Sequence, residues 1–270
     1  TFRAALDKCE AAFEDHTGES LLAVMHPELK GQQPSKLDAT QYAQPALFAL
    51  EWSLAQLWRA RGVVPSAVLG HSVGEIAAAC VAGAFSMEVG MRLVVERSRL
   101  MQALPPRDGV MVAARCGADA ATEAIAALGL EAEAAVASVN GPQSVVLAGS
   151  EPAVAAVLAE LGTAGTRLTV SHAFHSPLMA PMADEFRAAL ASMAEETGAF
   201  SVAPQVPLAS TVTGGVATVA ELADPEHWVR QVWSPVLFSG ALEAALEYSE
   251  ATHHVDVAAL RREMASEEVE

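Results

Sequence analysis

The sequence has 270 residues, of which 52% are hydrophobic and 18% charged, so it has enough apolar material for a large core and is unlike a disordered chain. It contains 33 acidic and 16 basic residues, and the formal net charge of −17 argues against nucleic acid or an anionic membrane surface as a partner. The length suits one large domain, or a large domain that carries a smaller inserted one.

The first part of the chain predicts three helices and a short strand. The run at residues 44–61 predicts a buried helix, with Pro45 in its first turn. Residues 67–70 are apolar and predict a short, fully buried strand. Residues 74–82 and 87–104 predict two more helices, and a pair of prolines ends the second.

The middle of the chain alternates short apolar strands with two helices. The predicted strands cover residues 110–115, 134–139, 144–148 and 166–170, and the helices cover 119–128 and 151–161. The order βαββαβ is typical of a ferredoxin-like unit. We therefore predict an α/β protein in which a small ferredoxin-like subdomain, residues 109–173, is inserted into a large α/β-hydrolase-like domain with a parallel sheet, residues 1–108 and 174–270.

The rest of the chain returns to the large domain. Residues 177–196 predict a long helix, and residues 207–211 predict a strand. Residues 225–233 and 236–248 predict two further helices. The last ten residues, 261–270, are charged and predict a frayed tail.

The sharpest motif is Gly70-His71-Ser72-Val73-Gly74, which lies between a predicted strand and a predicted helix. This G-x-S-x-G pattern is typical of a nucleophile elbow, a sharp turn that presents the serine hydroxyl. The pattern predicts Ser72 as a nucleophile, with the N–H of Val73 at the helix N-terminus as the oxyanion donor.

A serine nucleophile needs a base, for which histidine is the usual residue. His71 is adjacent to Ser72 and points away from it on such a turn, so it is a poor base. His172 and His175 lie where the chain leaves the predicted inserted subdomain, and a seam between two lobes is a common place for a cleft. We take His175 as the predicted base.

Several motifs in one order resemble the acyltransferase domains of modular polyketide synthases, relatives of the malonyl-CoA:acyl carrier protein transacylases. The similarity covers about residues 2–256. The matching segments include the Ser72 motif with its following glutamate, Ala43-Gln44-Pro45-Ala46-Leu47-Phe48, Asn140-Gly141-Pro142, His172-Ala173-Phe174-His175-Ser176-Pro177 and Gln231-Val232-Trp233-Ser234-Pro235-Val236.

The resemblance implies a dyad in which Ser72 attacks and His175 acts as general base and acid. It implies that backbone carbonyls orient the histidine, with Gln231 near that role, and that Arg97 binds the malonyl carboxylate through a planar guanidinium. Phe174 implies a preference for malonyl over methylmalonyl units, because its ring would fill the space that an α-methyl group needs. One methyl group in an apolar pocket changes the binding free energy by about 1–3 kcal/mol. The predicted substrate-binding set also includes His71, His172 and Asn140.

Two family features are not found in these residues. The family pattern opens with a strand and a Gly-Gln-Gly-Ser-Gln loop that supplies a second oxyanion donor, and this sequence starts after that point. Near the other end, Val257, Ala258 and Ala259 stand where the family has Gly-Pro-His. Because loss of one oxyanion donor costs about 10²–10³ in rate, we expect the present residues alone to be weakly active.

The resemblance also implies the partners. The substrate is malonyl-CoA, the acceptor is the phosphopantetheine thiol of an acyl carrier protein, and a ketosynthase is the neighbouring domain. No bound cofactor is implied. His253, His254 and Asp256 could suggest a metal site, but alternate residues of a strand face opposite sides and no third ligand is apparent. Scattered cysteines and no apparent leader or bilayer-length apolar run predict a cytoplasmic protein.

Two other functions remain open. A serine hydrolase, such as a thioesterase that clears acyl groups, would share the elbow. A scaffold domain with an impaired active site would also fit the missing loop. The predicted inserted subdomain and Arg97 favour the transferase over the hydrolase, and Ser72 with His175 favours it over the scaffold.

Overall fold

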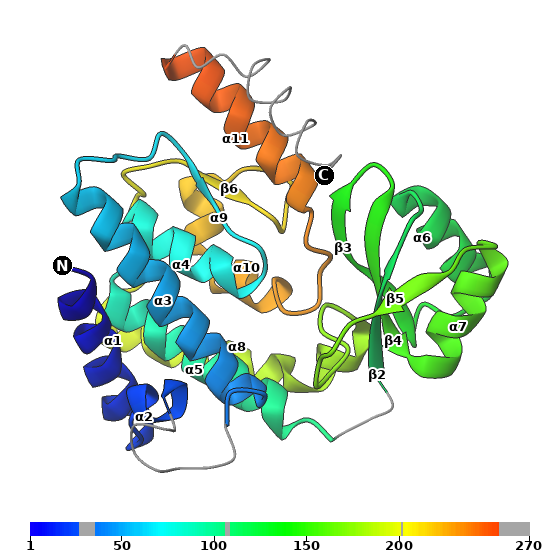
Figure 1. Cartoon of the computed structure of the whole chain (residues 1–270), viewed down its shortest axis with the longest axis horizontal. Helices are drawn as coiled ribbons and strands as arrows, with labels where there is room; N and C mark the ends of the chain where they lie inside the picture. The colour runs from blue at the N-terminus through cyan, green and yellow to red at the C-terminus, as the bar shows by residue number, and fades with distance from the viewer. Residues whose placement is uncertain (27–35, 106–108, 201, 254–270) are drawn as a thin grey trace.

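The computed structural model describes residues 1–26, 36–105, 109–200 and 202–253. They form two lobes: a large helical lobe around a small sheet, and a smaller lobe built on an antiparallel sheet (Figure 1). The motif at residues 257–259, the candidate metal residues His254 and Asp256, and the tail at 261–270 lie outside the described residues. Among the helices that are described, none is long and apolar enough to cross a membrane.

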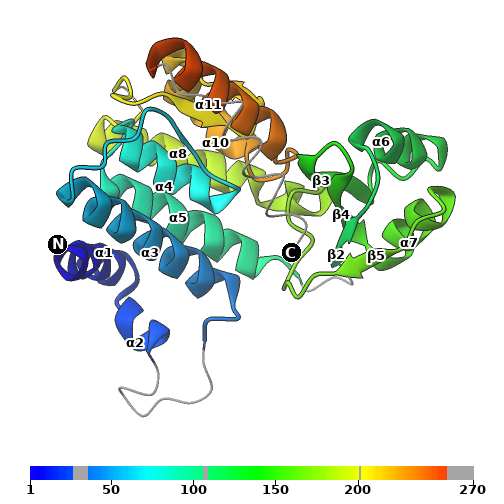
Figure 2. The ribbon, with the colours of Figure 1, turned by 45° about the horizontal axis from the view of Figure 1, so that its top comes forward.

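The large lobe is mostly helical, and Figure 2 shows α3, α4, α5 and α8 lying alongside one another. Its helices are α1 (Phe2–Thr17), α2 (Leu21–Met25), α3 (Thr40–Ala60), α4 (Val73–Ala82), α5 (Met87–Ala103), α8 (Ala183–Thr197), α9 (Val219–Ala223), α10 (Pro225–Arg230) and α11 (Phe238–His253), with the 3₁₀ helix η2 (Pro177–Met182) before α8. The predicted helix at 177–196 is therefore a 3₁₀ turn followed by an α-helix, since a second proline, Pro181, interrupts its first part.

One helix start was predicted wrongly. Helix α3 begins at Thr40, so Pro45 lies inside the helix and not in its first turn. A proline there has no N–H for the carbonyl of Gln41, four residues earlier. The hydroxyl of Ser98 on α5 donates to that carbonyl at 3.4 Å, which supplies a replacement partner from a neighbouring helix.

The large lobe contains a three-stranded sheet in the order β1-β6-β7. Strand β1 (Val68–Leu69) pairs in parallel with β6 (Leu208–Ser210), and β6 pairs antiparallel with β7 (Gly215–Val216). Residues facing one side, Leu69 and Ala209, pack on α11, while Val68 and Leu208 join the main core. The prediction that β1 is fully buried is wrong: both its residues are half-buried, because within the described residues only β6 pairs with it.

The small lobe has the element order β-α-β-β-α-β. It contains β2 (Gly109–Ala114), α6 (Ala118–Ala127), β3 (Ala134–Gly141), β4 (Ser144–Ser150), α7 (Glu151–Glu160) and β5 (Gly165–Arg167). Its four strands pair antiparallel in the order β3-β4-β2-β5. One face packs on α6 and α7, and Met111 on the other face packs against the segment that carries Ala173.

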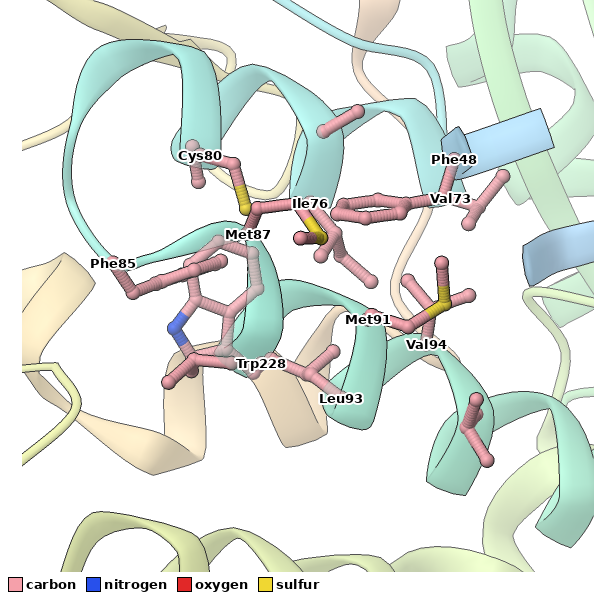
Figure 3. Packing of buried hydrophobic residues seen from close by; sticks show 14 of the residues in the cluster. Phe48, Val73, Ile76, Cys80, Phe85, Met87, Met91, Leu93, Val94 and Trp228 are labelled. Carbon is pink, nitrogen blue, oxygen red and sulfur yellow. The ribbon is translucent and has the colours of Figure 1, made fainter. Parts of the chain in front are cut away.

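The main core lies between α4 and α5 and reaches α10. Figure 3 shows Phe85 and Met87 beside Trp228, whose ring centroid lies 5.3 Å from that of Phe85 in an edge-on contact. Trp228 is 1% exposed, whereas Trp58 on α3 is 57% exposed. A tryptophan in an apolar run is thus a core residue only where a second element covers it.

Candidate active site

A sharp turn connects β1 to α4 and presents Ser72. The residue has φ 53° and ψ −117°, a conformation that side chains rarely adopt and that concentrates at functional sites. Ser72 is the N-cap of α4, so its neighbour Val73 is the first residue of the helix and its N–H has no intrahelical partner. Val73 and Ser72 both line the same cleft.

The two glycines of the elbow have different steric roles. A Cβ on Gly70 would meet the carbonyl carbon and oxygen of Gly74 at 2.1 Å, which leaves no room for a methyl group. A Cβ on Gly74 would come no closer than 3.6 Å to Glu51. Only the first glycine is therefore required by the close approach of strand and helix.

We expect Gly70→Ala to lower the free energy of unfolding by about 3 kcal/mol, because overpacking against backbone cannot relax. Gly74→Ala is the matched control, and we expect it to keep the wild-type stability. Urea unfolding midpoints measure both. Equal stability of the two variants would contradict the assignment of the close contact to Gly70.

His175 reaches Ser72 from the seam between the lobes. Its Nε2 lies 2.7 Å from Ser72 Oγ, and its Nδ1 lies 3.0 Å from the carbonyl oxygen of Ser234. Because a carbonyl only accepts, Nδ1 carries the hydrogen and Nε2 accepts from the serine hydroxyl. His175 also has a positive φ of 55°, so both ends of this hydrogen bond rest on strained backbone.

The surroundings keep the imidazole neutral. Burial lowers the pKa of His175 to about 3, and the positive charge of Arg97 lowers it further, while the bond to Ser234 opposes the shift. The neutral form is the one that can accept a proton from Ser72.

This pKa predicts an unusual pH dependence for any reaction that needs His175 as a base. We expect the rate of Ser72 acylation to stay constant as the pH falls from 8 to about 5, since the base form persists down to a pKa of about 3. Between pH 6.5 and about pH 3 the unfolded chain binds this proton and the folded chain does not. The free energy of unfolding therefore falls as the pH drops from 6.5 to about 3. Rapid-quench rates at several pH values check the first point, and a half-maximal rate near pH 6.5 would contradict it.

Arg97 completes the cluster. It lies on α5 and is 2% exposed, and its Nη2 donates to Ser72 Oγ at 3.1 Å. Its Nη1 donates to Gln44 Oε1, and its Nε has no hydrogen-bond partner among the described residues. Burial lowers the pKa of Arg97 to about 10, while the Glu75 carboxylate raises it. A buried guanidinium whose hydrogen-bond partners are neutral favours an anionic ligand beside it.

These residues share one cleft of about 470 Å³. Ser72, Arg97 and His175 are among its polar lining, and Phe174, Met111 and Leu47 are among its apolar lining. A pocket with an apolar wall and a few convergent polar groups is the usual form of a small-molecule site. The cleft therefore offers a nucleophile, a base and a cation to one ligand.

The other predicted site residues lie at different distances from this cluster. Gln231 Nε2 donates to the Ser72 carbonyl at 2.6 Å, and the backbone of Gln231 also bonds the His175 ring and raises its pKa. His71 borders the cleft, and its Nε2 lies 3.1 Å from Asn140 Oδ1, across the seam. His172 lines a separate small cavity with Leu104, and its ring centroid lies 5.9 Å from that of Phe174.

Two site residues were missed from the sequence. Ser234 acts through its backbone carbonyl, which no side-chain pattern marks. Gln44 contacts Arg97 from α3, and the available signal was an amide inside an apolar helix. Within the described ranges, no cluster of three metal-ligating side chains is present.

The comparison with protein families gives one match over almost the whole chain. A profile described as "Acyl transferase domain" matches residues 1–260. Among curated relatives, polyketide synthase GfsA of Streptomyces halstedii is 44% identical over 248 residues, which cover 89% of this chain and 3% of that protein. Mycoketide-CoA synthase of Mycobacterium tuberculosis is 42% identical over 240 residues, 87% of this chain and 6% of that protein. The chain thus spans a few per cent of the length of these relatives.

Solved structures agree with the family match. The acyltransferase domain from the second module of the salinomycin polyketide synthase has a TM-score of 0.79 and 42% identity, and the match covers 92% of this chain and 55% of that chain. An acyl carrier protein S-malonyltransferase from Vibrio cholerae has a TM-score of 0.75 and 27% identity, over 90% of this chain and 78% of that one.

Proposed function

This chain belongs to the acyl transferase domain family, and on that basis we propose that it loads a malonyl group from malonyl-CoA onto Ser72 and passes it to an acyl carrier protein. It is an acyltransferase domain of the kind found in polyketide synthases. The observation that carries the proposal is the convergence of Ser72, His175 and Arg97 in one cleft.

The proposed reaction has two matching halves. His175 Nε2 takes the proton of Ser72 Oγ as that oxygen attacks the thioester carbonyl, and the Val73 N–H stabilises the oxyanion. The imidazolium returns the proton to the coenzyme A sulfur as the C–S bond breaks, which leaves a malonyl-serine ester. The phosphopantetheine thiol then gives its proton to His175 and attacks the ester, and Ser72 recovers its hydroxyl.

Arg97 is the proposed partner of the malonyl carboxylate. We expect Arg97→Ala to lower kcat/KM for malonyl-CoA by roughly 10²-fold, the cost of losing a charge-assisted pair, and to change acetyl-CoA loading little. Arg99→Ala is the control, because Arg99 is on the same helix but forms ion pairs with Glu96 and Glu185 at the surface. Equal losses for both thioesters in Arg97→Ala would contradict the assignment.

Phe174 supports malonyl over methylmalonyl selectivity. The ring is half-buried and lines the cleft next to His175. An α-methyl group would have to share this space, and one methyl is worth about 1–3 kcal/mol in such a pocket. We therefore propose that the site prefers malonyl over methylmalonyl units but does not exclude methylmalonyl completely.

The proposal includes the partners and the setting. The acceptor is the phosphopantetheine of an acyl carrier protein, as the name of the Vibrio cholerae transferase supports, and a ketosynthase is the neighbouring domain in a larger synthase, as the length of the polyketide synthase relatives allows. No cofactor takes part. Three free cysteines, Cys9, Cys80 and Cys116, are consistent with a reducing cytoplasm.

The fold supports a finer division of the chain. We infer that residues 109–173 are a ferredoxin-like subdomain and that residues 1–108 with 174–270 are an α/β-hydrolase-like domain. The strand order β3-β4-β2-β5 and the serine turn between β1 and α4 support this division.

The test of the function compares transfer with hydrolysis. With malonyl-CoA and a carrier protein that bears phosphopantetheine, we expect malonyl-carrier to form much faster than free malonate. A hydrolase would release malonate at the same rate with or without the carrier, and a scaffold would form neither product.

A further inference from the structure

A buried acidic residue one helical turn beyond the nucleophile has no part in the proposed chemistry. Glu75 lies on α4, three residues after Ser72, and its side chain is fully buried. Its Oε1 accepts a hydrogen bond from Ser210 Oγ at 2.6 Å. Its Oε2 accepts bonds from the backbone N–H of Thr211 at 3.2 Å and from Thr211 Oγ1. Because all these partners are donors, the carboxylate joins the elbow helix to the end of β6.

A buried histidine faces the same carboxylate from a different element. His227 lies on α10, and its Nε2 is 3.5 Å from Glu75 Oε1. The side chain is fully buried, and neither ring nitrogen has a hydrogen-bond partner among the described residues. An imidazole buried without hydrogen-bond partners is costly, and the approach of the Glu75 carboxylate offsets part of this cost.

The turn that follows α10 contacts both members of the dyad, Ser72 and His175. The carbonyl of His227 accepts from the backbone N–H of Gln231 at 3.0 Å, one turn later. Gln231 Nε2 donates to the Ser72 carbonyl, and the Ser234 carbonyl accepts from His175. The turn that follows α10 therefore contacts the dyad, and α10 itself meets α4 through His227 and Glu75, one turn behind the dyad.

The apolar side of α10 is fixed separately. Trp228, next to His227, packs edge-on against Phe85 below α4 (Figure 3). Its Nε1 donates to the carbonyl of Leu222 at 3.3 Å. Packing thus holds α10 against the core, and the approach of Glu75 to His227 adds a polar contact between α10 and α4.

We propose that Glu75 and His227 are positioning residues for acyl transfer, because their buried contact fixes α10 against the elbow helix. Gln231 then holds the serine backbone, and Ser234 holds the histidine ring. This inference rests on the proposed transfer function. Neither Glu75 nor His227 touches the substrate, and both act through the geometry of the dyad.

The test uses two substitutions that nearly keep side-chain volume. Glu75→Gln places an amide NH₂ against donors from Ser210 or Thr211, and His227→Phe keeps a ring and removes its nitrogens. We expect each to slow malonylation of Ser72 by about 10²-fold, because small displacements of reacting groups have effects of that size. KM for malonyl-CoA stays within about threefold, since the loss falls on the chemical step.

Rates are measured by rapid quench and mass spectrometry on folded protein, with the folded fraction determined by circular dichroism. Val157→Ala is the control, because Val157 is fully buried on α7 in the small lobe, away from the cleft. We expect it to lower the melting temperature but to keep the wild-type rate per folded molecule. The double variant of Glu75 and His227 falls no further than the slower single one, since the two residues act as a unit.

The outcomes separate the two proposals. If wild-type protein forms no adduct on Ser72, the transfer function fails whatever the variants do. If the wild type forms the adduct and both variants load at the wild-type rate per folded molecule, the positioning role is overturned and the transfer function stands. If Glu75→Gln does not fold, His227→Phe alone decides.

Discussion

Replacement of Ser72 with alanine is expected to reduce malonyl transfer to the carrier protein by roughly 10⁴-fold or more, because the covalent intermediate has no other oxygen on which to form. The 2.7 Å contact with His175 and the 3.1 Å contact with Arg97 both end on this hydroxyl. We expect the variant to keep the fold, since the strained turn depends on Gly70 and on the bond from the Gln231 side chain to the Ser72 carbonyl. Transfer of labelled malonate to the carrier measures the loss.

The matched control is Ser66→Ala. Ser66 precedes β1 in the same lobe, and its hydroxyl lies 3.0 Å from the Ser249 hydroxyl, outside the cleft. We expect this variant to transfer malonate at the wild-type rate. Retention of transfer by Ser72→Ala would mean that another group carries the acyl chain.

Replacement of His175 with alanine is expected to lower the rate of Ser72 malonylation by about 10²–10⁴-fold, the usual contribution of a positioned general base. Binding of malonyl-CoA should change little, since Arg97 and the apolar wall of the cleft remain. Single-turnover rapid quench separates the two quantities. Because Ser72 and His175 act as a unit, adding this change to Ser72→Ala should cause no further loss.

His16→Ala is the control for a histidine that is not in the cleft, because His16 is exposed on the last turn of α1. It should load Ser72 at the wild-type rate. A His175→Ala variant that also loads at the wild-type rate would show that the base is another group, such as His71 at the edge of the cleft.

The local pattern of the chain was sufficient to predict the turn that presents Ser72. Gly70 and Ser72 predicted a turn between strand and helix, and the structure contains that turn with a positive φ at Ser72. The alternation of short strands and helices in residues 109–173 also matches the observed element order. Both features depend on near neighbours in the sequence, where steric limits and periodicity are informative.

Features set by contacts between distant segments were harder to predict. Pro45 looked like a helix start, but α3 continues through it because Ser98 on α5 bonds the freed carbonyl. Trp58 lies in an apolar run of α3, and yet it is exposed because no other described element covers it. The Ser234 carbonyl holds His175 across 59 positions, and a backbone atom leaves no residue-type signal.

The same reasoning explains the positioning pair. Glu75 follows the elbow motif directly, so its place on α4 could be predicted, but nothing in the sequence pairs it with His227, far along the chain. Burial brings them together, since both side chains are fully enclosed. A buried carboxylate and a buried histidine at separate sequence positions become informative only once the fold is known.

Intact-mass measurement after mixing the protein with malonyl-CoA, followed by peptide mapping, tests whether the cleft performs acyl transfer. We expect one malonyl group per folded chain, on the peptide that contains Ser72, and its removal when carrier protein with free phosphopantetheine is added. A folded chain that gains no mass, or that carries the malonyl group on another residue, would contradict it.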